Sequence, residues 1–224
     1  MLILPILRSL LFGLFFTLLS ASIAYYFVLS MKQVYHTMGI WQKNSKYLVL
    51  ILVNLISSTT WIALAWGSQL FWVDLLTLFT MNLIANLDGF TGRIPIYFLL
   101  MGLVLGLISG SLKNQIFVNV IGGVSNLILS MMIFFAGQTY KKQVLKQIDT
   151  TPVFGIGDFY ACGTLGFLFG SPVGNLVILL VLILTILGAG IQSLMTRAEF
   201  LKLRVKLGGS FHLATVLILM AKTL

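Results

Sequence analysis

Eight runs of mostly apolar residues follow one another along the chain, separated by polar connections. Each run is close to the roughly 20 apolar residues that a membrane-spanning helix needs. The longest connections are residues 31–46, 137–152 and 195–207, and none leaves room for a soluble domain. The pattern predicts an all-α, polytopic integral membrane protein with about eight transmembrane helices. The expected spans are residues 9–30, 47–66, 69–87, 95–112, 115–136, 153–171, 173–194 and 208–224.

Composition agrees with this pattern and excludes an ordinary soluble domain. Hydrophobic residues make up 59% of the 224 residues and charged residues only 8%, whereas about a quarter of the residues of a soluble domain are charged. We expect a single transmembrane domain over residues 1–224. Residues 1–81 would supply the first spans with a short cytoplasmic loop, and residues 82–224 carry the acidic motifs described below.

Basic residues predict the orientation, because cytoplasmic loops of membrane proteins carry an excess of Lys and Arg. With the N-terminus outside, eleven of the 14 basic residues fall on the inner side and three on the outer side. The chain is therefore expected to be N-out and C-out. This bias also accounts for the net charge of +9, so we expect the lipid bilayer as a partner and no nucleic acid.

Cysteine and histidine are too few for metal or disulfide chemistry. Cys162 is the single cysteine, and the two histidines, His36 and His212, lack paired ligand spacing. A disulfide framework and a cysteine-based zinc site are both excluded, and we expect neither a metal nor another cofactor. Structural roles are expected for both histidines, and Cys162 is interpreted as a small packing residue.

Two of the five acidic residues stand out. Asp88 and Asp158 both lie at the predicted cytoplasmic end of a span and beside glycine, the second as Gly155-Ile-Gly157-Asp158. An acid at the mouth of a membrane segment is costly and usually functional. Two carboxylates brought together cannot both ionise easily, so one keeps a proton while the other accepts one from water. Asp74 lies about 21 Å from Asp88 along a helix and is interpreted as an interfacial residue.

Helix dipoles suggest how the two acids would divide their work. Asp88 closes a helix, at a negative end, whereas Asp158 opens one, at a positive end; such ends shift a carboxylate by roughly 0.3–1 kcal/mol. We therefore predict that Asp158 is the ionised partner that activates water and that Asp88 carries the proton. The helix bearing Asp158 is expected to begin either at Pro152, capped by Thr150 or Thr151, or at the glycine motif itself.

Other polar and small residues have both structural and functional interpretations. Asn82 and Asn86 share a helix face and either line a path to Asp88 or hydrogen-bond to neighbouring helices. Glycines and amides in residues 119–126, and small residues in 162–170, predict close helix packing. In the turn after Asp88, Arg93 would anchor the cytoplasmic face, and Pro95 suits a first helical position.

Taken together, the motifs resemble the type IV prepilin peptidase family of GxGD membrane aspartyl proteases. The first motif is Asp88-Gly-Phe-Thr-Gly-Arg93-Ile94-Pro95, the second is Gly155-Ile-Gly-Asp158, and a weaker echo is Lys206-Leu-Gly208-Gly209-Ser-Phe211. The resemblance implies a membrane aspartic endopeptidase of the prokaryotic cytoplasmic membrane, with Asp88 and Asp158 catalytic. It would remove the short basic leader of a prepilin or pseudopilin precursor. Substrate contacts are expected at Gly155, Gly157, Arg93 and Pro95.

Departures from the family pattern leave alternatives open. Family members often have Lys where this chain has Tyr160, and many have Asn where it has Ile96. Larger members carry a cysteine-containing insert associated with methylating the product. The connection 31–46 has no cysteine, so we expect a peptidase without that domain. Whether the product is methylated stays open. A proton-coupled transporter, a non-catalytic pilus or secretion assembly protein, and a presenilin-like protease are the other candidates. Leu87, where presenilin-like proteases have Tyr, argues against the last.

Overall fold

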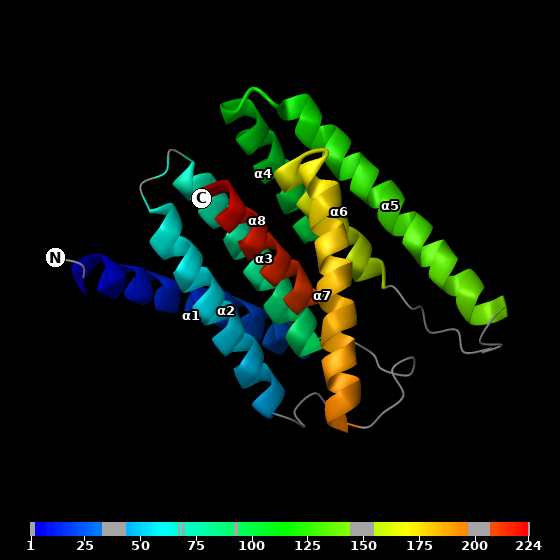
Figure 1. The fold of residues 1–224 in the computed structure, drawn as a ribbon, viewed down its shortest axis with the longest axis horizontal. Helices are drawn as coiled ribbons and strands as arrows, with labels where there is room; N and C mark the ends of the chain where they lie inside the picture. Colours follow the sequence, from blue (N-terminus) through cyan, green and yellow to red (C-terminus); the bar gives the residue numbers. More distant parts are fainter. Residues whose placement is uncertain are drawn as a thin grey trace. The chain divides into compact units, whose positions relative to one another are not determined.

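The computed structural model describes residues 3–32, 44–66, 68, 70–91, 94–143, 155–196 and 207–223. All regular structure in these residues is α-helical, as predicted (Figure 1). Each of the eight predicted apolar runs corresponds to one helix, although several helices, among them the first and the fifth, extend beyond their predicted runs. Their bounds are α1 Ile3–Lys32, α2 Asn44–Ala65, α3 Phe71–Thr91, α4 Tyr97–Leu112, α5 Ile116–Gln143, α6 Ile156–Phe169, α7 Val173–Thr196 and α8 Gly208–Thr223.

Three of these helices contain a stretch long and apolar enough to cross a membrane. The stretches are Leu7–Tyr26 in α1, Ile116–Tyr140 in α5 and Val173–Leu194 in α7. Shorter apolar helical stretches cover Ile51–Ala65, Tyr97–Leu112 and Ile156–Phe169.

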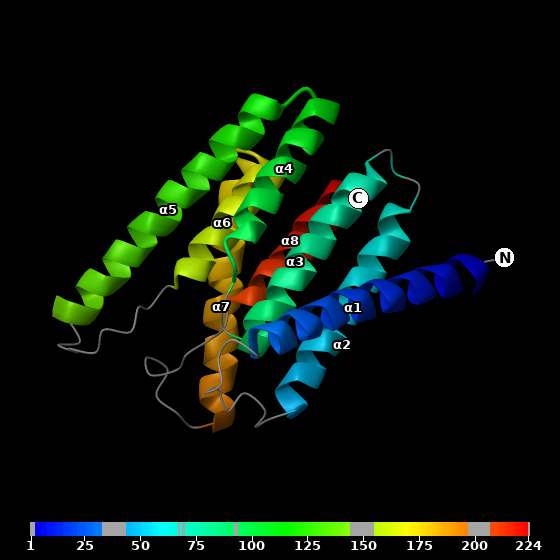
Figure 2. The same cartoon turned by 180° about the vertical axis from the view of Figure 1, so that it is seen from behind.

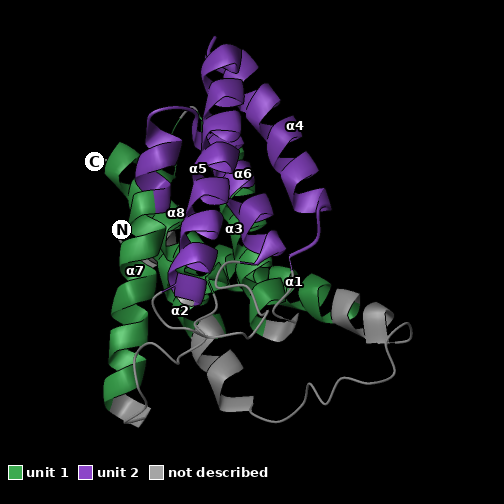
Figure 3. Ribbon diagram, turned by 90° about the vertical axis from the view of Figure 1, so that its right-hand side faces the viewer, with its two compact units in different colours: residues 1–93, 179–224 green, residues 94–178 purple. Residues whose placement is uncertain are grey.

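The chain forms two compact units, coloured separately in Figure 3. Unit 1 comprises residues 1–93 and 179–224, and unit 2 comprises residues 94–178. These units cut the chain differently from the predicted regions 1–81 and 82–224, because the last helix, α8, packs against α2 and α3. The boundary between the units falls inside α7.

Unit 1 is organised around α3, which packs against α1, α2 and α8. α8 also packs against α2, and α1 packs against α2 (Figure 2). The core of this unit includes large side chains that are fully buried: Trp61, Ile62, Leu78, Met81, Ile84, Leu87, Phe211 and Leu219. Buried asparagine, serine, threonine and histidine side chains lie among them, so this core is partly polar.

Unit 2 consists mainly of α4, α5 and α6, each packed against the other two. Glycine allows the helix backbones to touch: a Cβ added at Gly122 would lie 2.5 Å from the carbonyl oxygen of Gly166. Two amides bond across helices, Asn119 Nδ2 to the Gly106 carbonyl at 2.7 Å and Asn126 Nδ2 to the Cys162 carbonyl at 3.2 Å. The predicted close packing of these small and amide residues is confirmed.

Candidate functional site

Asp88 lies in the last turn of α3, and its side chain is only 6% exposed. Its Oδ2 accepts a hydrogen bond from the backbone N–H of Gly208, the first residue of α8, at 2.8 Å. α8 has no acidic residue in its own first turn. Asp88 therefore supplies, from α3, the carboxyl oxygen that accepts an N–H at the start of α8.

Gly208 makes this contact possible because it has no side chain. A Cβ at this position would lie 2.7 Å from the Cβ of Asp88, 2.9 Å from its Oδ2 and 3.0 Å from the Cα of Ala85. Real Cβ atoms do not approach other atoms so closely. Gly208 was noticed in the sequence only as part of a weak motif, and the structure shows that it receives Asp88.

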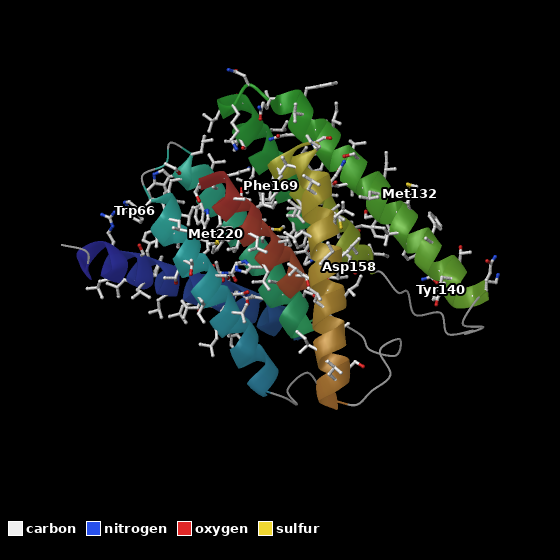
Figure 4. The ribbon with its side chains drawn as sticks, in the orientation of Figure 1. Trp66, Met132, Tyr140, Asp158, Phe169 and Met220 are labelled. Atoms are coloured by element: carbon white, nitrogen blue, oxygen red, sulfur yellow. The ribbon has the colours of Figure 1, made fainter. Side chains whose placement is uncertain are left out.

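Asp158 occupies the first turn of α6, where Figure 4 labels it. Its Oδ2 accepts the backbone N–H of Gly155 at 2.8 Å, and its own N–H donates to the Gly155 carbonyl at 3.0 Å. This reciprocal pair caps the helix. Of the two predicted start points, the described residues support the one at the glycine motif, since α6 begins at Ile156; Thr150, Thr151 and Pro152 lie outside the described residues.

The two glycines of the second motif differ in how tightly they are packed, and Gly157 has the closer contacts. A Cβ at Gly155 would lie 3.3 Å from the carboxylate oxygen of Asp158. A Cβ at Gly157 would lie 2.9 Å from the backbone nitrogen of Ile94 and 3.0 Å from its Cβ. Ile94 is only six residues after Asp88 in the sequence and is buried. Within unit 2, the second motif thus packs directly on the end of the first.

The predicted electrostatic difference between the two acids is not supported. Asp88 does close α3, but its carboxylate also meets the N-terminus of α8, and Asp158 meets the N-terminus of its own helix. Both carboxylates therefore accept a backbone N–H at a positive helix end. The prediction overlooked α8 because its first residue is 120 positions away in the chain.

A buried amide cluster in unit 1 includes Asn82 and Asn86, which precede Asp88 on α3. Asn54 Nδ2 donates to Asn82 Oδ1 at 3.1 Å and to Asn86 Oδ1 at 3.2 Å. Asn86 Nδ2 donates to Asn82 Oδ1 and to Ser20 Oγ, both at 3.0 Å. These four side chains are fully buried. Of the two interpretations of Asn82 and Asn86, the structure shows interhelical hydrogen bonding.

Other predicted residues fall as follows. Pro95 precedes α4 by two residues instead of opening it, and its carbonyl accepts the Phe98 N–H at 3.2 Å. Arg93 lies outside the described residues, as does His36. Asp74 lies in the first turn of α3, in the same continuous helix as Asp88, which confirms their separation.

Cys162 and His212 are buried inside the helical units, as the structural interpretations required. Cys162 is 2% exposed in unit 2. The His212 side chain is fully buried in unit 1, where its Nε2 shares a hydrogen bond with Ser57 Oγ at 2.9 Å. Among the residues that the structure describes, no group of three or more His, Cys, Asp or Glu side chains could hold a metal ion.

Asp88 belongs to unit 1, whereas Asp158 belongs to unit 2. Each carboxylate is oriented by one backbone N–H within its own unit. Such a carboxylate can accept a proton from water or donate one to a leaving group, provided that it carries the right protonation state. No protein-family model, curated protein or solved structure matches the chain.

Proposed function

We propose that this protein is a membrane aspartic endopeptidase, similar to the type IV prepilin peptidases, in which Asp88 and Asp158 are the catalytic pair. Its substrate would be a prepilin or pseudopilin precursor, cut between a short basic leader and the rest of the chain. The family resemblance rests on the two acidic motifs and their order in the sequence. The structure adds the local environment of each motif.

The contact between Ile94 and Gly157 is the observation that carries the proposal. It packs Ile94, six residues after Asp88 in the sequence, against the residue that precedes Asp158. A two-aspartate mechanism requires the two motifs to work side by side, and a glycine fitted to the end of the first motif serves that requirement. Gly157 thus has a reason to be glycine that an isolated GxGD sequence would lack.

A membrane location is supported by the apolar surfaces of the helices. Large hydrophobic side chains are exposed along them, including Phe15, Phe117, Ile183 and Leu194, which are 54–83% exposed. Trp66 and Trp72 flank the connection between α2 and α3 and are 37% and 65% exposed, as expected for aromatic residues at a membrane interface. We propose that all eight helices span the membrane, N-out and C-out, so that Asp88 and Asp158 lie at the cytoplasmic face.

In the proposed mechanism, the two carboxylates share one proton. The ionised carboxylate removes a proton from water, which attacks the scissile carbonyl carbon, and the protonated one delivers its proton to the leaving amine. The C–N bond breaks, and one water molecule is consumed. Backbone N–H groups of Gly208 and Gly155 hold the two carboxylates in fixed orientations. Since both carboxylates face a helix N-terminus, the dipoles do not decide which of them keeps the proton.

Substrate recognition is proposed for the turns that follow and precede the acids. The leader would unwind near Gly155 and Gly157, and Arg93 and Pro95 would line the turn after Asp88. Gly155 and Gly157 already pack against Asp158 and Ile94, so a substrate would meet them through their backbones.

The buried amide cluster of unit 1 favours a second candidate, a proton-coupled transporter. Asn54, Asn82 and Asn86 form a fully buried polar centre between helices, and polar groups inside a membrane bundle often mark transport paths. Proton-coupled flux in proteoliposomes that is lost in Asp88→Asn, with no peptide cleavage, would replace the peptidase by the transporter.

Co-expression with a panel of prepilin-like precursors tests the peptidase. Mass spectrometry of the precursor should show loss of the leader with the wild-type protein and intact precursor with Asp88→Asn or Asp158→Asn. Asp74→Asn is the matched control and should cleave normally. Cleavage that persists in either of the first two variants would remove that residue from the mechanism.

A further inference from the structure

Unpartnered polar atoms are concentrated in the core of unit 1. Among the described residues, seven fully enclosed side-chain nitrogen or oxygen atoms have no hydrogen-bond partner in the protein, and six of them lie in unit 1. They come from all four packed helices, α1, α2, α3 and α8. The six atoms are Thr17 Oγ1, Asn54 Oδ1, Ser58 Oγ, Trp61 Nε1, Asn82 Nδ2 and His212 Nδ1.

These side chains are at most 1% exposed. Buried polar groups in proteins are nearly always hydrogen-bonded, because leaving one dry forfeits its hydration without replacement. Six such groups in one four-helix core cannot each be an isolated exception. They therefore indicate that this core holds hydrogen-bond partners that are not part of the protein chain.

Three of the six unpartnered groups belong to α2. Asn54, Ser58 and Trp61 are spaced by four and three residues and lie on one face of α2, over about 10 Å. Asn54 is bonded to Asn82 of α3, and Ser57, beside Ser58, is bonded to His212 of α8. The unpartnered groups thus follow α2 where it meets α3 and α8.

The chemistry of the six groups identifies the ligand class. Asn54 Oδ1 only accepts hydrogen bonds, whereas Asn82 Nδ2 and Trp61 Nε1 only donate, and the hydroxyls do both. A metal cation would need acceptors alone, and an anion would need donors alone. Water donates and accepts, and a buried water typically makes about three hydrogen bonds.

We propose that the core of unit 1 binds a group of internal water molecules along α2, held by Asn54, Ser58, Trp61, Asn82 and His212, with Thr17 at its α1 side. The site ends one helical turn from the contact between Asp88 and Gly208, since Gly208 and His212 are four residues apart on α8. It is independent of whether the protein cleaves peptides.

The direction in which a substitution shifts the thermal midpoint distinguishes a core that holds water from one that does not. Thr17→Val keeps the side-chain shape and removes an unpartnered hydroxyl. In a dry core this removal relieves a penalty and raises the thermal midpoint. At a water site it breaks a bond to water, so we expect the midpoint in detergent to fall by about 2–4 °C. The matched control is Thr215→Val, which removes a buried hydroxyl that donates to the Phe211 carbonyl at 2.9 Å and should lower the midpoint similarly.

Radiolytic hydroxyl-radical labelling of the wild-type protein provides a second readout, because radicals form from bound water as well as from bulk water. We expect the Trp61 ring to be labelled although it is fully buried, with Trp72, 65% exposed, as the dose reference. An increased midpoint in Thr17→Val, or unlabelled Trp61 beside labelled Trp72, overturns the proposal. A wild-type midpoint that rises with Na⁺ or K⁺ at constant ionic strength would overturn it too, in favour of a cation.

Discussion

Asp88 accepts a hydrogen bond that stabilises the fold, and we propose that it also acts in catalysis. Two substitutions separate these roles. Asp88→Ala removes the acceptor of the Gly208 N–H and leaves that N–H buried beside α3. Asp88→Asn keeps an amide oxygen that can accept the same bond but removes the charge. We therefore expect the alanine variant to lose stability and the asparagine variant to lose mainly activity.

The magnitude follows from the contact. A hydrogen bond to a charged group contributes about 1.5–3 kcal/mol, and a carboxylate at a helix N-terminus adds about 0.3–1 kcal/mol. Their loss in Asp88→Ala should therefore cost about 2–4 kcal/mol. At roughly 2–4 °C per kcal/mol for a chain of this size, the midpoint should fall on the order of 10 °C. The asparagine variant keeps a neutral bond and should lose only about 1 kcal/mol.

Thermal unfolding in detergent, followed by tryptophan fluorescence, measures both changes. Gly208→Ala is the control, because its Cβ would crowd the same carboxylate from the α8 side and should reproduce the loss seen in Asp88→Ala. The reasoning would be refuted by an Asp88→Ala midpoint equal to that of the wild type. It would also be refuted by an asparagine variant as unstable as the alanine variant.

Three further substitutions test contacts inside unit 1 or inside unit 2, by the same unfolding measurement. Gly157→Ala places a Cβ against the Ile94 backbone and should lower the free energy of unfolding by about 1–3 kcal/mol. Gly188→Ala, with no atom within 4 Å of its Cβ, should be neutral or stabilising. Equal midpoints for the two variants would contradict the tight fit at Gly157. Gly166→Ala should separate α5 from α6 and cost about 1–3 kcal/mol or more, and a wild-type midpoint would show that these backbones do not touch. Asn86→Leu breaks the bonds at the centre of the amide cluster and should cost at least about 2 kcal/mol, so an unchanged midpoint would show that the cluster contributes little.

Helix positions could be predicted well from the sequence, because long apolar runs bounded by polar connections leave few alternatives. The predicted run 208–224 and α8, Gly208–Thr223, differ by one residue. The start of α4 was predicted less well, because Pro95 was expected to open the helix. It lies instead in the preceding turn, and the first helical residue is Tyr97.

Contacts between distant segments could not be predicted in the same way. Glycine spacing indicated that α6 packs closely, but the sequence does not say that Gly166 meets Gly122 or that Gly157 meets Ile94. The prediction that Asp88 lies only at a negative helix end failed for the same reason, because the N-terminus that it meets belongs to the distant helix α8. Local pattern predicts helices, whereas the partner of each polar or small residue depends on tertiary packing.

The polar core of unit 1 was only partly foreseen. Asn82 and Asn86 were identified because they share a face of α3, but Asn54 and Ser20 were not. In the sequence both lie inside apolar runs with no motif around them. A single polar residue in the middle of a span is a weak signal on its own, and only the helix packing shows that Asn54 bonds to Asn82 and Ser20 to Asn86.

Peptide release by purified protein tests the central claim most directly. The assay reconstitutes each protein in proteoliposomes with prepilin-like precursors and determines the masses of the products by mass spectrometry. The proteins compared are the wild type and the variants Asp88→Asn, Asp158→Asn and Asp74→Asn. We predict release of the leader with the wild type and Asp74→Asn, and no release with the other two. The mass of the new N-terminus shows whether it is methylated. Release by Asp88→Asn or Asp158→Asn, or no release of any leader by folded wild-type protein, would contradict the two-aspartate peptidase.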